Sequence, residues 1–247
     1  MLKRFRADLH IHTCLSPCSE LDMNPRDIVD RAREAELDII GITDHNSAEN
    51  VEATRRAARG TGITVWGGME ITSSEEVHVL AFFGGADALR RMQEIVYEYL
   101  PPQENDEKFY GEQVIVNEFK EVMGFNRRLL IAATGLNVQG VLTEIAALGG
   151  ISIASHIDKQ AFSVLSQLGF IPEDLRFHAL ELSPNVSRTE AEAKFASLKK
   201  FPWVSFSDAH HVTDIGRRVT TLLMEEPTLD EMRQALVDGG GRNVVWE

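Results

Sequence analysis

The chain contains 247 residues, of which 43% are hydrophobic and 26% are charged, a composition typical of a globular protein with a full-sized core. Disordered, collagen-like and coiled-coil chains are therefore excluded. Asp and Glu (38) outnumber Lys and Arg (25), and the formal net charge of -13 argues against a broad basic surface for nucleic acid or anionic lipid. A phosphate-containing partner would have to be held locally.

The N-terminal residues lead directly into a strand-like segment, and no apolar stretch reaches the length of a signal peptide or a membrane span. We therefore expect a cytoplasmic protein with no membrane partner. The two cysteines, Cys14 and Cys18, are expected to be reduced, since a chain of this size needs no disulfide. The unusual feature is the set of eight histidines, because six of them fall in short blocks that also contain Asp, Glu or Ser.

The first hundred residues alternate between β-rich and helical segments, the pattern of a parallel α/β fold. A strand is predicted at residues 5–10. Asn24 and Pro25 then mark the start of a helix that carries Ile28 and Val29 on its apolar face. The further elements predicted in this part are strands at 38–43, 63–67 and 77–83 and helices at 48–59 and 86–100.

The alternation breaks between about residues 101 and 140. This segment is polar, and its apolar triplets at 114–116 and 129–131 flank Gly124, which predicts an inserted β-hairpin arm or lid beside the active-site rim. The later elements predicted are helices at 141–148, 161–168 and 190–199 and one opened by Thr228, with strands at 151–154, 178–182, 203–206, 219–223 and 244–245. Seven or eight such units favour a (β/α) barrel over an open doubly wound sheet, whose glycine-rich turn after the first strand is missing.

Polar side chains cluster where the predicted strands end. His10 and His12 lie two apart at the end of the first strand, so both leave the same face and can chelate one metal ion. Because the strand ends of a parallel barrel open onto one rim, we expect the other polar blocks to meet them there. Those blocks are Thr43-Asp44-His45, Glu70, Ser155-His156-Ile157-Asp158 and Ser207-Asp208-Ala209-His210.

Taken together, these blocks resemble the PHP family, the polymerase and histidinol phosphatase domains. The resemblance runs in order through Asp8-Leu9-His10-Ile11-His12-Thr13, Thr43-Asp44-His45, Gly68-Met69-Glu70, His78, Ser155-His156 and Asp208-Ala209-His210. It implies a metal-dependent phosphoesterase on a distorted (β/α)7 TIM-like barrel, with an inserted helix/β-hairpin arm. Residues 1–247 are accordingly predicted to form a single PHP domain, with the insertion at about 101–140 inside it.

The resemblance also implies a centre of two or three divalent ions, for which zinc, manganese and iron are all suitable. Its ligands are His10, His12, Glu70 and Asp208 for the first ion, Glu70, His78 and His156 for the second, and His45 and His210 for the third. The ligands His10, His12, Glu70, Asp208 and His210 are also the expected catalytic residues.

Two positions depart from the family pattern. Where many members complete the third site with His or Asp, this chain has Pro17, Cys18 and Ser19, so we expect a thiolate ligand from Cys18, with Glu20 or Asp22 as alternatives. His78 lies near the start of a predicted strand, although a rim ligand is expected at its end. A kinked or early-ending strand would restore it to the rim, and a buried structural histidine is the alternative.

We expect residues around the ligands to orient the metal-binding histidines or to contact the substrate. Asp8 and Asp44 are placed to accept an imidazole N–H and so to fix the tautomer of a metal-binding histidine. Lys159, His211 and Arg217 are candidate substrate contacts near the rim, with a solvated surface role as the alternative.

We therefore expect hydrolysis of a phosphate ester by a hydroxide that bridges two metal ions. The expected substrate is a small phosphorylated metabolite, a nucleotide or a short oligonucleotide, without stable duplex binding. The alternatives are a metal hydrolase of a non-phosphate bond, such as an amide, and a noncatalytic metal-binding accessory module. Motifs for a serine hydrolase, a P-loop enzyme or a zincin are absent from the sequence. The sequence does not indicate the oligomeric state.

Overall fold

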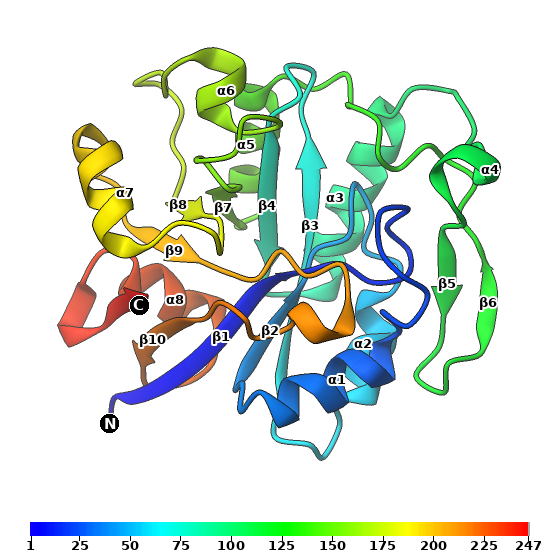
Figure 1. Cartoon of the computed structure of the whole chain (residues 1–247), viewed down its shortest axis with the longest axis horizontal. Coiled ribbons are helices and arrows are strands. Elements are labelled where there is room, and N and C mark those ends of the chain that lie inside the picture. The colour runs from blue at the N-terminus through cyan, green and yellow to red at the C-terminus, as the bar shows by residue number, and fades with distance from the viewer. Residues whose placement is uncertain (247) are drawn as a thin grey trace.

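The computed structural model describes residues 1–246, which fold around one large sheet (Figure 1). Its strands are β1 (Lys3–Ile11), β2 (Ile39–Ile42), β3 (Thr64–Thr72), β4 (His78–Phe83), β7 (Ile151–Ala154), β8 (Ala179–Leu182), β9 (Trp203–Ser205), β10 (Thr220–Met224) and β11 (Asn243–Trp246). They are hydrogen-bonded in the order β11-β10-β1-β2-β3-β4-β7-β8-β9. Since β9 and β11 also lie close together, the sheet forms a nearly closed barrel, as expected for the predicted fold.

Helices pack around the outside of this barrel and at one end of it. They are α1 (Pro25–Glu34), α2 (Val51–Ala57), α3 (Ala86–Tyr99), α4 (Glu107–Tyr110), α5 (Val138–Ala147), α6 (Val164–Leu168), α7 (Arg188–Lys194) and α8 (Leu229–Ala235), with short 3-10 turns η1 (Ala196–Leu198), η2 (Val212–Asp214) and η3 (Gly239–Gly241). The predicted caps are confirmed, because Asn24 accepts the N–H of Asp27 and Thr228 accepts the N–H of Glu231. No helix in the described part of the chain has the length and apolar content needed to cross a membrane.

Two apolar cores hold these layers together. The barrel interior contains Leu9, Trp66 and Phe82, and Met232 of α8 closes it at one end. The second core lies between the outer face of the sheet and the helices α1, α2, α3 and α5. Burial of both faces explains why the short strands consist mainly of apolar residues rather than alternating with polar ones.

The sheet is mixed, and the expectation of parallel strands throughout is wrong. Strand β4 runs antiparallel to both β3 and β7, and β10 runs antiparallel to β1 and β11. Residues 73–77 between β3 and β4 are too few for a parallel crossover, so these two strands form a hairpin. As a result, the start of β4 lies at the rim where β3 ends, and His78 pairs with Thr72.

The insertion contains a hairpin, but not the one predicted. Strand β5 (Val114–Val116) pairs with β6 (Val122–Phe125) rather than with residues 129–131. The side chain of Asn117 closes the turn by accepting the N–H groups of Phe119 and Glu121, so the turn precedes Gly124. Residues 129–131 lie elsewhere, at the barrel rim.

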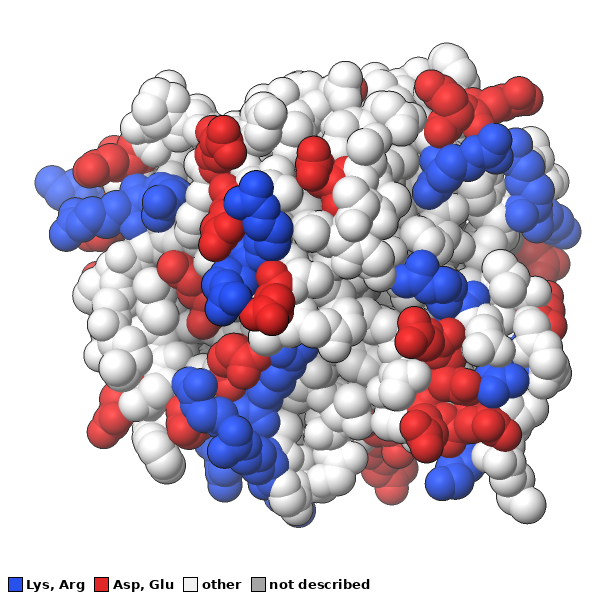
Figure 2. All heavy atoms as spheres, turned by 180° about the vertical axis from the view of Figure 1, so that it is seen from behind, with Lys and Arg blue, Asp and Glu red and all other residues white. Residues whose placement is uncertain are grey.

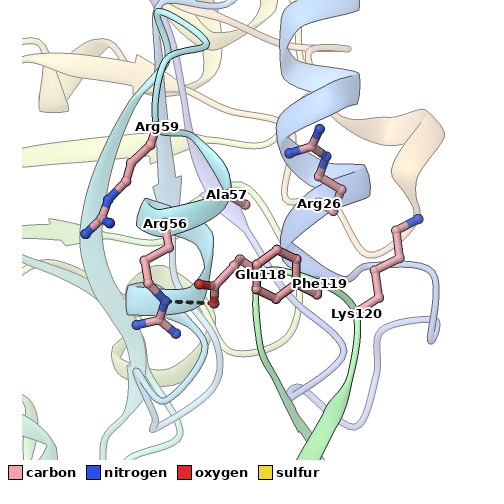
Figure 3. A pocket seen from close by; sticks show the side chains of 7 residues that line it. All are labelled: Arg26, Arg56, Ala57, Arg59, Glu118, Phe119 and Lys120. Carbon is pink, nitrogen blue, oxygen red and sulfur yellow. Dashed lines mark hydrogen bonds and ion pairs between the residues drawn. The ribbon is translucent and has the colours of Figure 1, made fainter.

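The hairpin is fastened to the outer surface of α1 and α2. Glu118 at its tip accepts a hydrogen bond of 2.7 Å from Arg56 of α2, as Figure 3 shows, and Lys120 pairs with Asp27 of α1 at 2.5 Å. Asn50, which precedes α2, bonds to the main chain of β5 with both side-chain atoms. These hydrogen bonds and ion pairs position the insertion against the barrel.

Candidate metal centre

A β-bulge in β1 directs His10 and His12 toward the barrel interior. The register of β1 against β2 shifts between Asp8 and Ile11. Before the shift Leu9 packs in the inner core, whereas Ile11 after it packs in the outer core. The shift therefore changes which side chains face inward, and bulges commonly re-aim side chains next to functional sites in this way.

The carboxylate of Glu70, near the end of β3, lies at the centre of a group of five histidines from four segments of the chain. The imidazole nitrogens within 3.5 Å of it belong to His78 (3.0 Å), His45 (3.2 Å), His10 (3.3 Å), His156 (3.4 Å) and His12 (3.5 Å). Oδ1 of Asp208 lies 3.3 Å from Nε2 of His10 and 3.5 Å from Nε2 of His12. The topology therefore brings these seven side chains together.

The donor atoms of this cluster fit divalent cations. Five of them are buried and have no hydrogen-bond partner among the described residues, namely Nε2 of His10, Nε2 of His12, Nδ1 of His45, Nδ1 of His78 and Oε1 of Glu70. Buried polar atoms are normally satisfied, and bound ions would satisfy these. Two triplets have ligand atoms within 4.8 Å of one another, one formed by His10, His12 and Asp208 and one by His45, Glu70 and His78.

Cys18 joins a further group. Its Sγ and the ring nitrogens of His12, His45 and His210 all lie within 4.8 Å of one another, and the rings of His12 and His210 stack at 4.3 Å. Glu20 and Asp22, the alternative ligands, belong to none of these groups in the part of the chain that the structure describes. Both cysteines are free thiols. The structure thus places all nine predicted ligands in one cluster.

Burial and neighbouring charges set the protonation states in this cluster. Burial lowers the pKa of His12 to about 3, with the adjacent His210 acting in the same direction, and burial also lowers the pKa of His45. Burial opposes ionisation of Glu70 and Asp208, but the surrounding histidines outweigh it and hold the pKa of both carboxyl groups well below the usual range. Burial opposes protonation of His10, but the carboxylates of Glu181, Asp208 and Glu70 outweigh it and raise the pKa of His10 well above the usual value. Metal ions bind neutral imidazoles and ionised carboxylates, so His10 would release a proton when an ion binds.

The partner of His10 is Glu181 of β8, not Asp8. Nδ1 of His10 lies 3.0 Å from both carboxylate oxygens of Glu181, which also accepts the main-chain N–H of His156. Asp8 instead accepts the N–H groups of Ser207 and Gly216, because it precedes the bulge and faces outward. A glutamate inside an otherwise apolar strand was the sequence signal for this role.

Asp44 supports His12 rather than its neighbour His45. It accepts hydrogen bonds from the main chain and hydroxyl of Thr13 and from the hydroxyl of Ser16. Oγ of Ser16 in turn lies 3.1 Å from Nδ1 of His12. Since Ser16 donates its proton to Asp44, it accepts from His12, and Nε2 of His12 is left free to face the cluster.

A cavity of about 490 Å³ opens onto the cluster. Lys159 lines it and donates a hydrogen bond to Asp208, while Ile131 of the insertion and Phe162 form an apolar wall. Phe162 lies in the segment predicted to begin a helix at residue 161, but this segment lines the cavity and α6 begins only at Val164. The ring of Phe162 stacks on His78 at 4.6 Å. The insertion therefore borders the cavity, as expected.

The other two candidate substrate contacts do not line this cavity. His211 is exposed, and Arg217 directs its Nε to the carbonyl oxygen of Ser207 and lines a separate hollow. Of the three predicted substrate contacts, Lys159 alone lies in the cavity beside the metal-binding side chains.

A nearly closed α/β barrel with histidine and carboxylate side chains gathered at one rim is typical of metal-dependent hydrolases. The model of the PHP domain family matches residues 8–171, more than half of the chain, and the chain belongs to this family. Membership in the family supports a metal-dependent hydrolase. No protein of curated function matches the sequence significantly.

Solved structures share the fold at low sequence identity. The lesion-specific endonuclease PfuEndoQ of Pyrococcus furiosus superimposes with a TM-score of 0.74 at 18% identity, over 98% of this chain and 58% of that chain. A Bifidobacterium adolescentis protein assigned as a metal-dependent phosphoesterase gives a TM-score of 0.58 at 19% identity, over 94% of this chain and 96% of that one. This chain thus spans little more than half the length of the endonuclease.

One expectation about partners has to be corrected. Endonuclease Q has also been solved in complex with a 27-mer duplex that carries an abasic lesion at the active site, and this complex matches with a TM-score of 0.72 at 18% identity, over 98% of this chain and 58% of that chain. A protein of this fold therefore binds duplex DNA, and the expectation that stable duplex binding is excluded is wrong. It rested on net charge, which does not describe how charges are distributed over the surface.

Proposed function

We propose that the chain is a metal-dependent phosphoesterase that hydrolyses a phosphate ester at a centre of two or three divalent ions. The observation that carries this proposal is the convergence of unpartnered nitrogens from His10, His12, His45 and His78 on the buried carboxylate of Glu70. One carboxylate surrounded by imidazoles is suited to bridging two ions, because its charge offsets the repulsion between them. Residues 1–247 would act as a single domain.

The proposed ligands divide into three neighbouring sets. They are His10, His12, Glu70 and Asp208 for the first ion, Glu70, His78 and His156 for the second, and Cys18, His45 and His210 for the third. His45 also lies 3.2 Å from Glu70, so it stands between the last two sets. When bound, such ions lower the pKa of water and neutralise charge on a phosphoryl group.

Other side chains would orient the ligands and receive the substrate. Glu181 and Ser16 hold the Nδ1 atoms of His10 and His12, which leaves both Nε2 atoms facing inward. Lys159 is the one Lys or Arg side chain that lines the cavity among the described residues. Its ammonium group is placed to exchange its contact with Asp208 for a contact with a phosphate oxygen. Ile131 and Phe162 would exclude water from one side of the cavity.

A substrate panel tests this proposal. Protein loaded with zinc, manganese or iron is assayed on sugar phosphates, nucleotides, short oligonucleotides and p-nitrophenyl phosphate, with an amide panel in parallel. Asp208→Asn should reduce hydrolysis at least about 100-fold while the circular dichroism spectrum stays unchanged, because the charged ligand becomes neutral. Turnover of amides alone would favour a hydrolase of another bond. An absence of turnover with metals bound would favour an accessory module.

A further inference from the structure

The cavity at the metal-binding cluster has a lining of two kinds. One part consists of the proposed metal ligands, and the other side chains that line it are those of Ile131, Lys159, Gln160, Ala161 and Phe162. Three of these five are apolar, so only Lys159 and Gln160 offer side-chain hydrogen bonds from outside the ligand set. At about 490 Å³, the cavity has room for an organic group beside a phosphate.

The main chain of Phe162 is held in an unusual conformation at the edge of this cavity. Its φ angle is 58°, in the left-handed region that is strained for a residue with a bulky side chain. The main-chain N–H of His78 donates to the carbonyl oxygen of Phe162 at 2.9 Å, and the hydroxyl of Ser163 donates to that of Lys159 at 2.8 Å. The loop of residues 159–163 is therefore fixed at both ends, and strain retained in this way is common where ligands bind.

The ring of Phe162 is only partly covered by its neighbours. It stacks on the imidazole of His78 at 4.6 Å, with an angle of 14° between the two planes. The residue is nevertheless 40% exposed, although it lines a cavity and is fixed in place. Because aromatic rings stack favourably with other rings, the uncovered part of Phe162 offers a flat apolar surface to a ligand.

The charged side chains of the cavity suit a ligand with one anionic group. Lys159 is the one Lys or Arg side chain that lines it among residues 1–246, and this lysine pairs with Asp208. Outside the cavity, Arg56 is paired with Glu118 in the hollow of Figure 3, and basic and acidic side chains lie beside each other on the face seen in Figure 2. A second anionic group in the cavity would lack a side-chain cation of its own, and its desolvation would oppose binding.

We propose that the cavity binds a phosphate ester whose ester-linked group is flat, apolar and uncharged, and that this group stacks on Phe162 and contacts Ile131. This inference rests on the proposed phosphoesterase function and names its substrate class. The hydroxyl groups of a sugar would find few side-chain partners in this cavity, so the cost of removing them from water would not be recovered. Phe162 determines specificity, while the metal-binding cluster receives the phosphate.

Binding is measured first, independently of turnover. Isothermal titration calorimetry of the zinc-loaded protein compares benzylphosphonate with methylphosphonate, which have no ester bond to hydrolyse. The wild-type protein should bind benzylphosphonate at least about 10-fold more tightly, because its ring is buried. Phe162→Ala should reduce this ratio of Kd values about 3- to 10-fold, and Phe162→Tyr, which keeps the ring, should preserve it. Loss of bound ions would weaken the binding of both phosphonates, so the ratio reports the ring contact alone.

The matched control is Phe170→Ala, which removes the same side chain from a residue that is 64% exposed and does not line the cavity. We expect the wild-type ratio for this variant. A wild-type ratio near one, an equal ratio in the wild-type protein and Phe162→Ala, or the same loss in Phe170→Ala would overturn the proposal. An absence of binding of both phosphonates would overturn it as well.

Turnover is then measured with benzyl phosphate, a carboxybenzyl phosphate, methyl phosphate and glucose 6-phosphate. All four are esters of unactivated alcohols, and hydrolysis of each forms a bond from water oxygen to phosphorus and releases the alcohol, whose oxygen takes a proton. Differences in kcat/KM therefore report the ester-linked group. Benzyl phosphate should exceed each of the others at least about 10-fold.

The two measurements separate this inference from the proposed function. Turnover without a preference for benzyl phosphate would overturn the inference and leave the proposed function intact. Binding of benzylphosphonate that depends on Phe162, without hydrolysis of any ester, would instead overturn the proposed function while supporting the contact of an apolar ring with Phe162.

Discussion

Glu181 controls the orientation of two proposed metal ligands. Its oxygens lie 3.0 Å from Nδ1 of His10, and one of them also accepts the main-chain N–H of His156. Because the carboxylate accepts a hydrogen bond from Nδ1–H of His10, Nε2 of His10 remains available toward Glu70 and Asp208. A residue outside the ligand set thus determines which nitrogen faces the cluster.

We expect Glu181→Gln to lower the affinity for the ion at His10 about 10- to 100-fold, the usual effect of removing a group that orients a ligand. An amide offers one acceptor oxygen where the carboxylate offers two. Competition with a zinc indicator measures the affinity. The control is Asp158→Asn, which removes a carboxylate that bonds to Ser183 and to no imidazole. Wild-type affinity in Glu181→Gln would show that His10 is oriented without it.

Cys18 tests the third set of ligands. Because Sγ lies within 4.8 Å of the nitrogens of His12, His45 and His210, Cys18→Ala should reduce the metal content by one ion per chain. Mass spectrometry of the native protein or elemental analysis gives the count. Cys14→Ala is the matched control, since this buried thiol lies near the carbonyl oxygen of Val114 and outside the cluster. An unchanged count in Cys18→Ala would remove Cys18 from the centre.

At the scale of elements, β1 carries two functions that its bulge separates. Its first half packs Leu9 against the barrel interior, and its end directs His10 and His12 to the rim. Strand β2 approaches so closely there that a Cβ at Gly41 would lie 2.6 Å from the carbonyl oxygen of Leu9. The position of the two histidines thus depends on a direct contact between the main chains of β1 and β2, which Gly41 allows because it has no side chain.

Gly41→Ala should therefore destabilise the protein by about 1–3 kcal/mol, the usual cost of overpacking, because the added methyl group meets main-chain atoms that cannot rotate away. Urea denaturation of the metal-free protein measures the free energy of unfolding. Gly84→Ala is the control, because nothing lies within 4 Å of a Cβ at that position. Equal stability of the two variants would contradict the close contact between β1 and β2.

At the scale of the whole molecule, the metal-binding cluster joins strands that are far apart in sequence. Its side chains come from β1, β3, β4 and the loops after β1, β2, β7 and β9. Ions bound there would crosslink the rim of a barrel whose sheet is only nearly closed. Ligand binding to the folded state alone raises stability by mass action.

Removal of the ions with EDTA should lower Tm by roughly 5–10 °C. A site whose free ion is at 100 times Kd contributes about 2.7 kcal/mol, and each kcal/mol shifts Tm by about 2–4 °C in a chain of this size. Differential scanning calorimetry with and without added zinc measures the shift. Glu70→Gln should reduce the difference between the two conditions. The same Tm in both would show that the cluster binds no ion with useful affinity.

The sequence alone determined which side chains gather at the rim and the class of the fold. Local patterns carry this information, because His10 and His12 at a spacing of two share a face of a strand, and caps such as Asn24 act within one helical turn. The strands of the large sheet were also predicted, since most are short apolar runs bounded by turns.

The tertiary structure decided features that depend on contacts between distant residues. These are the antiparallel direction of β4, which returns His78 to the rim, the bulge that turns Asp8 outward, and the choice of Glu181 as the partner of His10. The pairing of β5 with β6 belongs to the same group. Strand direction and pairing depend on long-range packing, and a surface charge pattern exists only once the chain is folded.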